Sequence, residues 1–261
     1  MNKFTRRTVI AAACAAAAMT FAPMSFAQQA PEKKDVTIAV GGKSLYYYLP
    51  LSIAEQLGYF KDEGLNVKIV DFQGGSRSLQ AVVGGSADVV SGAFEHTISM
   101  QAKKQPMTAF VLQGRAPQLA LVVSNKTMKD YKQLSDLKGK KVGVTAPGSS
   151  SQMVANFILK KGGLGPKDVA FIGVGSSSGA VSAIRSGQID ALINLDPVIT
   201  ILLKNGDAKL VADTRKVKES ESFFGGTMPA GCLYAPVSFV EKNPKTVQAL
   251  TNAIVRAADW L

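Results

Sequence analysis

An internal repeat at a spacing of 102 residues is the feature that most constrains this chain. Residues 65–76, LNVKIVDFQGGS, share with residues 167–178, KDVAFIGVGSSS, the pattern of a strand that runs into a Gly/Ser turn. At the same spacing, residues 81–90 align with residues 183–192, and both segments pass from helical spacing through a glycine stop into a new strand. A repeat of this length predicts two structurally equivalent halves.

The order of elements within each half predicts the fold class. Residues 36–42 read as a strand before a glycine turn, and residues 141–148 read the same way, so each half begins strand, turn, helix, strand, turn, helix, strand. Strands that alternate with helices of about 10–15 residues are typical of parallel sheets covered by helices. The sequence therefore predicts an α/β protein with two lobes, each with a central, mainly parallel sheet flanked by helices.

Gly/Ser turns follow the first two strands of each half and point to a ligand cleft. The turns are Gly41-Gly42-Lys43-Ser44, Gly74-Gly75-Ser76, Gly148-Ser149-Ser150-Ser151 and Gly175-Ser176-Ser177-Ser178. Ligands of such sheets bind at the carboxyl ends of the strands, and helix N-termini offer free N–H groups to anions. One such turn would be explained by capping alone. Four at equivalent places predict ligand contacts at Ser44, Gly75, Ser76, Ser149, Ser150 and Ser151.

Two glycine-rich segments are predicted to be hinge crossovers between the lobes. Residues 113–117 interrupt two apolar strand-like runs, and residues 223–231 precede a further strand. This places residues 35–115 in the first lobe, residues 116–224 in the second lobe, and residues 225–261 back in the first.

The N-terminus has the pattern of a secretion signal, with a predicted cut after Ala27. Basic residues precede an alanine-rich run from Val9 to Ala22, which is too short for a membrane span. The pair Arg6-Arg7 also resembles a twin-arginine signal, so the export route stays open. The predicted domains thus begin with a signal peptide at residues 1–27, and the predicted location is the periplasm.

Composition excludes several classes of function. After removal of the leader Cys232 is the only cysteine, which excludes an internal disulfide. The formal charge of +11 includes three charges of the leader, and the remaining +8 favours anionic partners. The lysines occur in scattered pairs without a basic stripe interleaved with aromatics, which argues against nucleic acid. The sole histidine, His96, has no partner at metal spacing and no nucleophile nearby in the sequence. No metal, cofactor or catalytic residue is predicted.

Three stretches resemble the periplasmic binding proteins of the nitrate, sulfonate and taurine type, whose relatives bind thiamine pyrimidine precursors. They are residues 50–65, PLSIAEQLGYFKDEGL, residues 137–150, LKGKKVGVTAPGSS, and residues 186–191, SGQIDA. The resemblance implies a type II periplasmic binding protein fold with two hinge crossovers. It also implies service to an ATP-driven importer, with an inner-membrane permease and its ATPase as partners.

The chain departs from that family in two places. Members usually carry an aromatic residue and a glutamate before the proline of the second lobe, whereas this chain has Leu195-Asp196-Pro197. Members also run several dozen residues further, while this chain stops within the helical pattern 246–261. We therefore expect the sequence to be part of a longer protein.

Further ligand residues are predicted outside the Gly/Ser turns. Tyr46 is the first choice among three consecutive tyrosines, with packing at the lobe surface as the alternative. Phe94 and Glu95 end the third strand, and a carboxylate there favours a ligand that carries a donor or positive group. Arg115 would pair with a carboxylate or sulfonate if the crossover aimed it inward, and would otherwise be a surface residue. The first interpretation of Asp196 is a helix N-cap, with Pro197 at the first helical position. The second is a ligand contact.

Three classes of function are compatible with this sequence. The first is a monomeric binding subunit that captures a small, anionic organic, sulfonate or nitrate-type solute for an ABC importer, without catalysis. The second is a protein that binds thiamine-pyrimidine precursors, or an enzyme related to the synthases that make them. The third is a sensor subunit that presents ligand to a membrane receptor.

Overall fold

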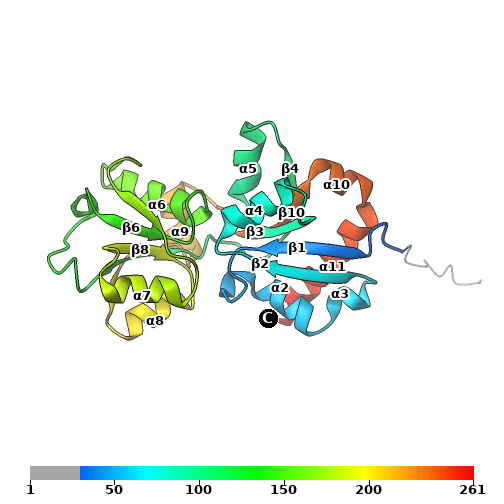
Figure 1. Ribbon diagram of the computed structural model, residues 1–261, viewed down its shortest axis with the longest axis horizontal. Coiled ribbons are helices and arrows are strands. Elements are labelled where there is room, and N and C mark those ends of the chain that lie inside the picture. Colours follow the sequence, from blue (N-terminus) through cyan, green and yellow to red (C-terminus); the bar gives the residue numbers. More distant parts are fainter. Residues whose placement is uncertain (1–29) are drawn as a thin grey trace, which may run out of the picture. The chain divides into compact units, whose positions relative to one another are not determined.

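Two five-stranded sheets, each with helices on both faces, make up the described part of the chain (Figure 1). The computed structural model describes residues 30–261. The predicted signal peptide, residues 1–27, lies outside the described residues. No helix within the described range is long and apolar enough to cross a membrane.

The first sheet has the strand order β2-β1-β3-β10-β4. Its strands are β1 Asp35–Val40, β2 Asn66–Asp71, β3 Val89–Ala93, β4 Met107–Leu112 and β10 Gly231–Pro236. Its helical elements are η1 Tyr46–Tyr48, α2 Leu49–Gln56, α3 Tyr59–Asp62, α4 Gly75–Val83, α5 Glu95–Ala102, α10 Val237–Lys242 and α11 Pro244–Trp260. Strands β1, β2 and β3 are parallel, whereas β10 pairs antiparallel with β3 and β4.

The second sheet repeats this plan in the order β7-β6-β8-β5-β9. Its strands are β5 Ala120–Ser124, β6 Lys141–Val144, β7 Ala170–Gly173, β8 Ala191–Asn194 and β9 Ala208–Asp213. Its helical elements are η2 Leu134–Leu137, α6 Ser150–Lys161, α7 Ser178–Ser186, α8 Val198–Lys204 and α9 Val217–Phe224. Here β5 is the antiparallel strand, paired with β8 and β9. The predicted plan of two mainly parallel, helix-flanked sheets is confirmed, and we call them lobe 1 and lobe 2.

Alternating side chains on the central strands bury both faces of each sheet. In β1, Val36, Ile38 and Val40 join the core beneath α2, α3 and α11, while Ala39 joins the opposite core beneath α4. In β5, Leu121 and Val123 pack on one face, and Ala120 and Val122 pack on the other with residues of α7 and α8. Successive side chains of a strand point to opposite faces, so these apolar runs specify strands that are covered on both sides.

The chain passes between the sheets twice, after β4 and after β9. The first connection spans residues 113–119 and the second spans residues 214–230, including α9. On the lobe 1 side, the Gln113 N–H donates to the Gly231 carbonyl at 2.6 Å and the Ala230 N–H to the Gly114 carbonyl at 3.3 Å. These bonds hold the two connections side by side. We propose that the two connections are the boundaries between the lobes.

Helix α9 belongs to the lobe 2 end of the second connection. The rings of Phe224 and Phe157 lie 5.3 Å apart between centroids, and the Lys161 ammonium lies over the ring of Phe223. The residues after α9, Gly225 to Pro229, are therefore the part of this connection that is left to bend.

Candidate functional site

The Gly/Ser turns of the two lobes meet each other directly. The Ser76 N–H donates to the Ser149 hydroxyl oxygen at 3.0 Å, and the Ser76 hydroxyl donates to the Pro147 carbonyl at 2.9 Å. The Ser149 hydroxyl in turn donates to the Ser76 hydroxyl at 3.2 Å. These residues follow β2 and β6, at the carboxyl ends of parallel strands. The second turn of lobe 1 therefore meets the first turn of lobe 2, and the N-terminus of α4 lies against the N-terminus of α6.

A cleft of about 930 Å³ opens beside this contact and is lined by both lobes. Lobe 1 contributes polar side chains that include Ser44, Asp71, Gln73 and Arg77, and lobe 2 contributes Thr145, Ser176, Ser177 and Gln188. Asp71 already accepts the N–H groups of Gly42 and Lys43 at 2.8 and 2.9 Å. The Arg77 side chain is exposed and has no ion pair within residues 30–261. The cleft thus offers hydroxyl and amide groups together with one free cation.

Glycine at position 42 permits the close approach of the two lobes. Its φ of +102° is strained for other residues, and a Cβ there would lie 2.3 Å from the Ser176 hydroxyl oxygen of lobe 2. The turn at residues 41–44 differs from its prediction in one respect. It leads into the short 3₁₀-helix η1, and α2 starts only at Leu49.

The three tyrosines of η1 are divided between interior and surface. Tyr47 and Tyr48 are buried, whereas Tyr46 is 60% exposed. The Tyr46 N–H donates to the Asp196 carbonyl of lobe 2 at 3.1 Å. The structure therefore brings Tyr46 and Asp196 together through the backbone, and a ligand role for the Tyr46 phenol stays a prediction.

The three predicted serines of the second lobe have different surroundings. Ser149 is buried in the contact with Ser76. Ser151 is fully buried, and its hydroxyl oxygen accepts the Thr145 N–H at 3.0 Å and lies 2.9 Å from the Thr145 hydroxyl. Ser150 is the first residue of α6, half-buried, and its hydroxyl has no partner in the described part of the chain. Of the three hydroxyls, that of Ser150 is uncommitted.

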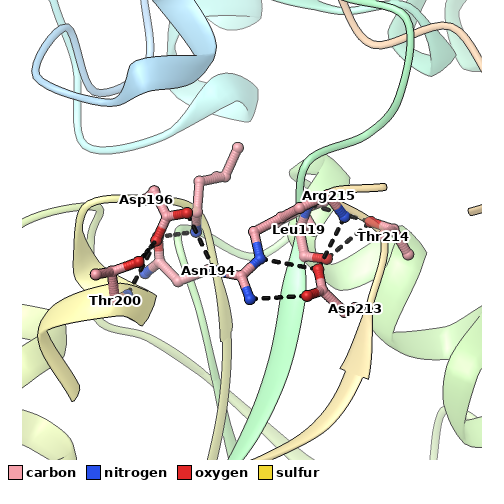
Figure 2. A network of polar contacts seen from close by, with 8 residues as sticks. Leu119, Asn194, Asp196, Thr200, Asp213, Thr214 and Arg215 are labelled. Atoms are coloured by element: carbon pink, nitrogen blue, oxygen red, sulfur yellow. Dashed lines mark hydrogen bonds and ion pairs between the residues drawn. The ribbon is translucent and has the colours of Figure 1, made fainter. Parts of the chain in front are cut away.

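Asp196 belongs to a polar network at the ends of β8 and β9 (Figure 2). One carboxylate oxygen accepts the N–H and the hydroxyl of Thr200 at 2.9 and 2.7 Å, and the other accepts from Arg215 at 3.1 Å. The predicted helix start is displaced by one residue, because Pro197 is the N-cap of α8 and Val198 its first residue. The Asp196 carboxylate still satisfies an N–H of the first turn.

Phe94 and Glu95 lie where β3 passes into α5, and their positions differ. Phe94 is half-buried and packs against the core beneath α4, with its N–H donating to the Ala230 carbonyl. Burial raises the pKa of Glu95 to about 7, and its Oε1 atom has no hydrogen-bond partner among the described residues. A carboxyl group of this kind holds its proton near neutral pH and could then donate as well as accept.

His96 is a candidate residue to which the sequence assigned no role. It is buried, its Nδ1 lies 2.8 Å from the Tyr234 hydroxyl, and its Nε2 is without a hydrogen-bond partner in the described range. A Cβ on Gly75 would lie 3.1 Å from His96 Cε1, so the ring lies directly behind the first residue of α4. Burial lowers the pKa of His96 to about 4, an effect that the Gly148 backbone partly offsets. The imidazole is therefore neutral at pH 7.

The sequence predicted no ligand role for Arg77 or Ser176. Ser176 belongs to the turn at residues 175–178, and Arg77 directly follows the turn at residues 74–76. Their position directly after Ser76 and Gly175 was the available signal. Arg115, which was selected, is exposed and has no hydrogen bond or ion pair with the described residues. Within those residues no group of three or more His, Cys, Asp or Glu side chains could hold a metal ion.

Residues 46–261 match the family described as NMT1/THI5 like. The chain belongs to this family. Among curated proteins, it is 26% identical to the putative binding protein YtlA of Bacillus subtilis, over 100% of this chain and 75% of that protein. It is 24% identical to the 4-amino-5-hydroxymethyl-2-methylpyrimidine phosphate synthase of Candida albicans, over 87% of this chain and 67% of that enzyme. The chain spans about two thirds of the length of the synthases it matches.

Solved structures confirm the type II binding-protein fold. A protein from Bordetella bronchiseptica RB50 is 64% identical with a TM-score of 0.88, over 89% of this chain and 73% of that chain. The nitrate-binding protein NrtA from Synechocystis has a TM-score of 0.73 at 19% identity, over 88% of this chain and 63% of that chain. The alkanesulfonate-binding protein SsuA from Xanthomonas axonopodis, bound to MOPS, has a TM-score of 0.69 at 21% identity, over 87% and 73%. The family and fold implied by the sequence resemblance are therefore confirmed.

Proposed function

We propose that this chain is the solute-binding subunit of an ABC importer and acts in the periplasm as a monomer. The observation that carries the proposal is the convergence of the repeated Gly/Ser turns of both lobes beside a polar cleft. The fold shared with proteins named for binding nitrate and alkanesulfonate supports it. The partners would be an inner-membrane permease and its ATPase.

The ligand that fits this cleft is a small solute with an anionic end. Pro147 of lobe 2 lines the cleft, and helix α6 begins three residues later with the uncommitted Ser150 hydroxyl. Arg77 lines the cleft from α4 and supplies an unpaired positive charge. Helix N-termini and guanidinium groups both favour carboxylate, sulfonate or nitrate oxygens. The partly protonated Glu95, the first residue of α5, would suit a donor group elsewhere on the same solute.

Binding would be coupled to rotation of the lobes. The segments left to bend between the paired parts of the connections are short, at residues 115–117 and 225–229. A solute that contacts both lobes stabilises the closed arrangement by its difference in affinity for the two states. The direct contacts of Ser76 with Ser149 and Pro147 would open to admit it.

A synthase activity is the second candidate, because several family relatives are named as pyrimidine phosphate synthases. We propose binding without turnover, since structures named as alkanesulfonate- and nitrate-binding proteins share the fold over 87% and 88% of this chain. YtlA, named as a putative binding protein, also aligns with the whole chain. Chemical analysis of the bound solute after prolonged incubation distinguishes the two functions. Recovery of an altered solute would favour the enzyme.

A thermal-shift screen against nitrate, sulfonates, taurine, aromatic carboxylates and pyrimidine precursors tests the proposed function. A ligand at about 100 times its dissociation constant should stabilise the protein by about 2.7 kcal/mol. Cell fractionation tests the location, since the chain should reach the periplasm in shortened form. The absence of a shift with every solute class, or retention in the cytoplasm, would contradict the proposal.

The neighbouring serines of α6 should separate affinity from stability. We expect Ser150→Ala to weaken binding of the best solute from that screen about tenfold to a hundredfold, because a hydrogen bond to a charged group is worth about 1.5–3 kcal/mol. Ser151→Ala should instead lower the free energy of unfolding by about 1–3 kcal/mol, because it leaves the buried Thr145 N–H without its acceptor. Calorimetry and denaturant unfolding measure both quantities for each variant.

The opposite result for the pair is informative. If Ser150→Ala binds with unchanged affinity while Ser151→Ala loses affinity without losing stability, the assignment of the ligand's anionic end to the Ser150 hydroxyl is wrong.

A further inference from the structure

Arg215 connects the ends of two strands of lobe 2. Its Nε and one terminal nitrogen donate to the two carboxylate oxygens of Asp213 at 2.8 and 2.7 Å, and its other terminal nitrogen donates to Asp196 at 3.1 Å. Asp213 is the last residue of β9 and Asp196 lies two residues after β8. Strands β8 and β9 both flank β5. The guanidinium therefore bridges the ends of β8 and β9 next to the residue at which β5 begins.

At the same strand ends, hydrogen bonds join the two connections between the lobes. The Thr214 N–H donates to the Leu119 carbonyl at 2.8 Å, and the Leu119 N–H donates to the Thr214 hydroxyl oxygen at 3.1 Å. The Gln118 N–H donates to the Thr214 carbonyl at 3.2 Å. Figure 2 shows this pairing beside Arg215. Arg215 is therefore the residue directly after Thr214, which pairs the two connections on the lobe 2 side.

Asp196 extends the connection to lobe 1. Its carboxylate is held by Thr200 and Arg215, while its carbonyl oxygen accepts the Tyr46 N–H. The side chains of Asp196, Arg215 and Asp213 are 17–23% exposed, so solvent screens them only in part. Without the guanidinium, two carboxylates near one another would repel, and the turn that carries Asp196 would lose its anchor to the hinge.

We propose that Arg215 is a positioning residue for lobe closure, which holds Asp196 so that its carbonyl oxygen meets the Tyr46 amide of the opposite lobe. The inference rests on the proposed function in that closure is the step that traps the solute. Arg215 itself need not touch the solute.

A double-mutant cycle in ligand-free protein tests the proposal. Spin labels at Lys68→Cys in lobe 1 and Lys167→Cys in lobe 2 report the distance between lobes, and the fully buried Cys232 is left unlabelled. Arg215→Met should lower the ratio of short to long distances about threefold to tenfold, the range expected for one net hydrogen bond. Arg185→Met, which breaks the Arg185–Asp207 pair elsewhere in lobe 2, is the control and should leave the ratio unchanged.

Tyr46→Pro removes the amide donor itself, and Tyr46→Ala is its matched reference. Leu45 has φ −73° and ψ 138°, a conformation that a following proline accepts, and the Tyr46 N–H makes no other bond. If Arg215 acts through Asp196, Arg215→Met should have no further effect on the distances in the Tyr46→Pro background, but should keep its effect in Tyr46→Ala. Arg215→Lys keeps the positive charge but loses the planar guanidinium that bonds both aspartates. It should give an intermediate ratio of short to long distances.

Equal effects of Arg215→Met in the proline and alanine backgrounds would overturn the proposal, as would a ratio no different from that of Arg185→Met. Denaturant unfolding of each variant identifies any that is not folded at the temperature of the distance measurement. A failed solute screen would overturn the proposed function while leaving these ligand-free distances to be explained. An unchanged ratio together with a positive screen would remove only the role of Arg215.

Discussion

The free energy of unfolding should fall by about 3 kcal/mol between pH 4.5 and pH 8 on account of Glu95, and Glu95→Gln should remove this loss. Burial raises the pKa of Glu95 from 4.5 to about 7. A carboxyl group whose pKa is raised on folding stabilises the protein fully below its unfolded pKa. This stabilisation is lost as the pH rises through the folded value, because the folded state must then bury a charge.

The comparison between wild type and Glu95→Gln isolates this group. The nearby Tyr47, Tyr48 and Tyr234 have pKa values raised by burial, and the pKa of Cys232 is raised to about 12, so all four stay neutral in this range. Glu241→Gln is the control, because Glu241 is exposed in α10 and has no hydrogen bond or ion pair with the described residues. Denaturant unfolding at half-unit intervals of pH gives the difference curve. Parallel curves for wild type and Glu95→Gln would show that Glu95 titrates alike in folded and unfolded protein.

Acidification should lower the free energy of unfolding by a similar amount because of His96. Burial lowers the pKa of its imidazole from 6.5 to about 4, so the stabilisation is complete above pH 6.5 and is lost progressively as the pH falls to 4. The expected loss is about 3 kcal/mol, because the folded state must bury an imidazolium that water would solvate in the unfolded chain. His96→Asn should abolish this pH dependence.

Proton NMR of untagged protein measures this pKa directly, because His96 is the only histidine of the chain. Tyr234→Phe serves as a second variant. It removes the 2.8 Å contact with Nδ1 but retains the burial, so the pKa should stay well below 6.5. A titration near 6.5 in wild type would mean that the ring is solvated in solution. The burial of His96 next to Gly75 would then be wrong.

The sequence alone predicted the parts of this protein that depend on local pattern. The 102-residue repeat corresponds to β2, α4 and β3 in lobe 1 and to β7, α7 and β8 in lobe 2. Turn chemistry predicted that helices follow the turns at residues 74–76 and 175–178, and α4 starts at Gly75 and α7 at Ser178. These signals are local, because apolar period and backbone preferences at glycine act over a few neighbouring residues.

The sheet order was not available from the sequence. Strands β10 and β5 enter their sheets antiparallel, between strands that are distant in sequence. No local period carries the choice of neighbours, because the side chains of a strand alternate in the same way whichever strands flank it.

For the candidate site, the sequence by itself determined which turns carry donors, and only the tertiary structure decided which of them are free. Ser150 and Ser151 are adjacent, yet one hydroxyl is uncommitted and the other is held by Thr145. His96 and Tyr234 lie 138 residues apart, and Arg215 reaches back to Asp196 across β5. The physical reason is that burial and pairing set the cost of a polar group, and both depend on which segments packing brings together.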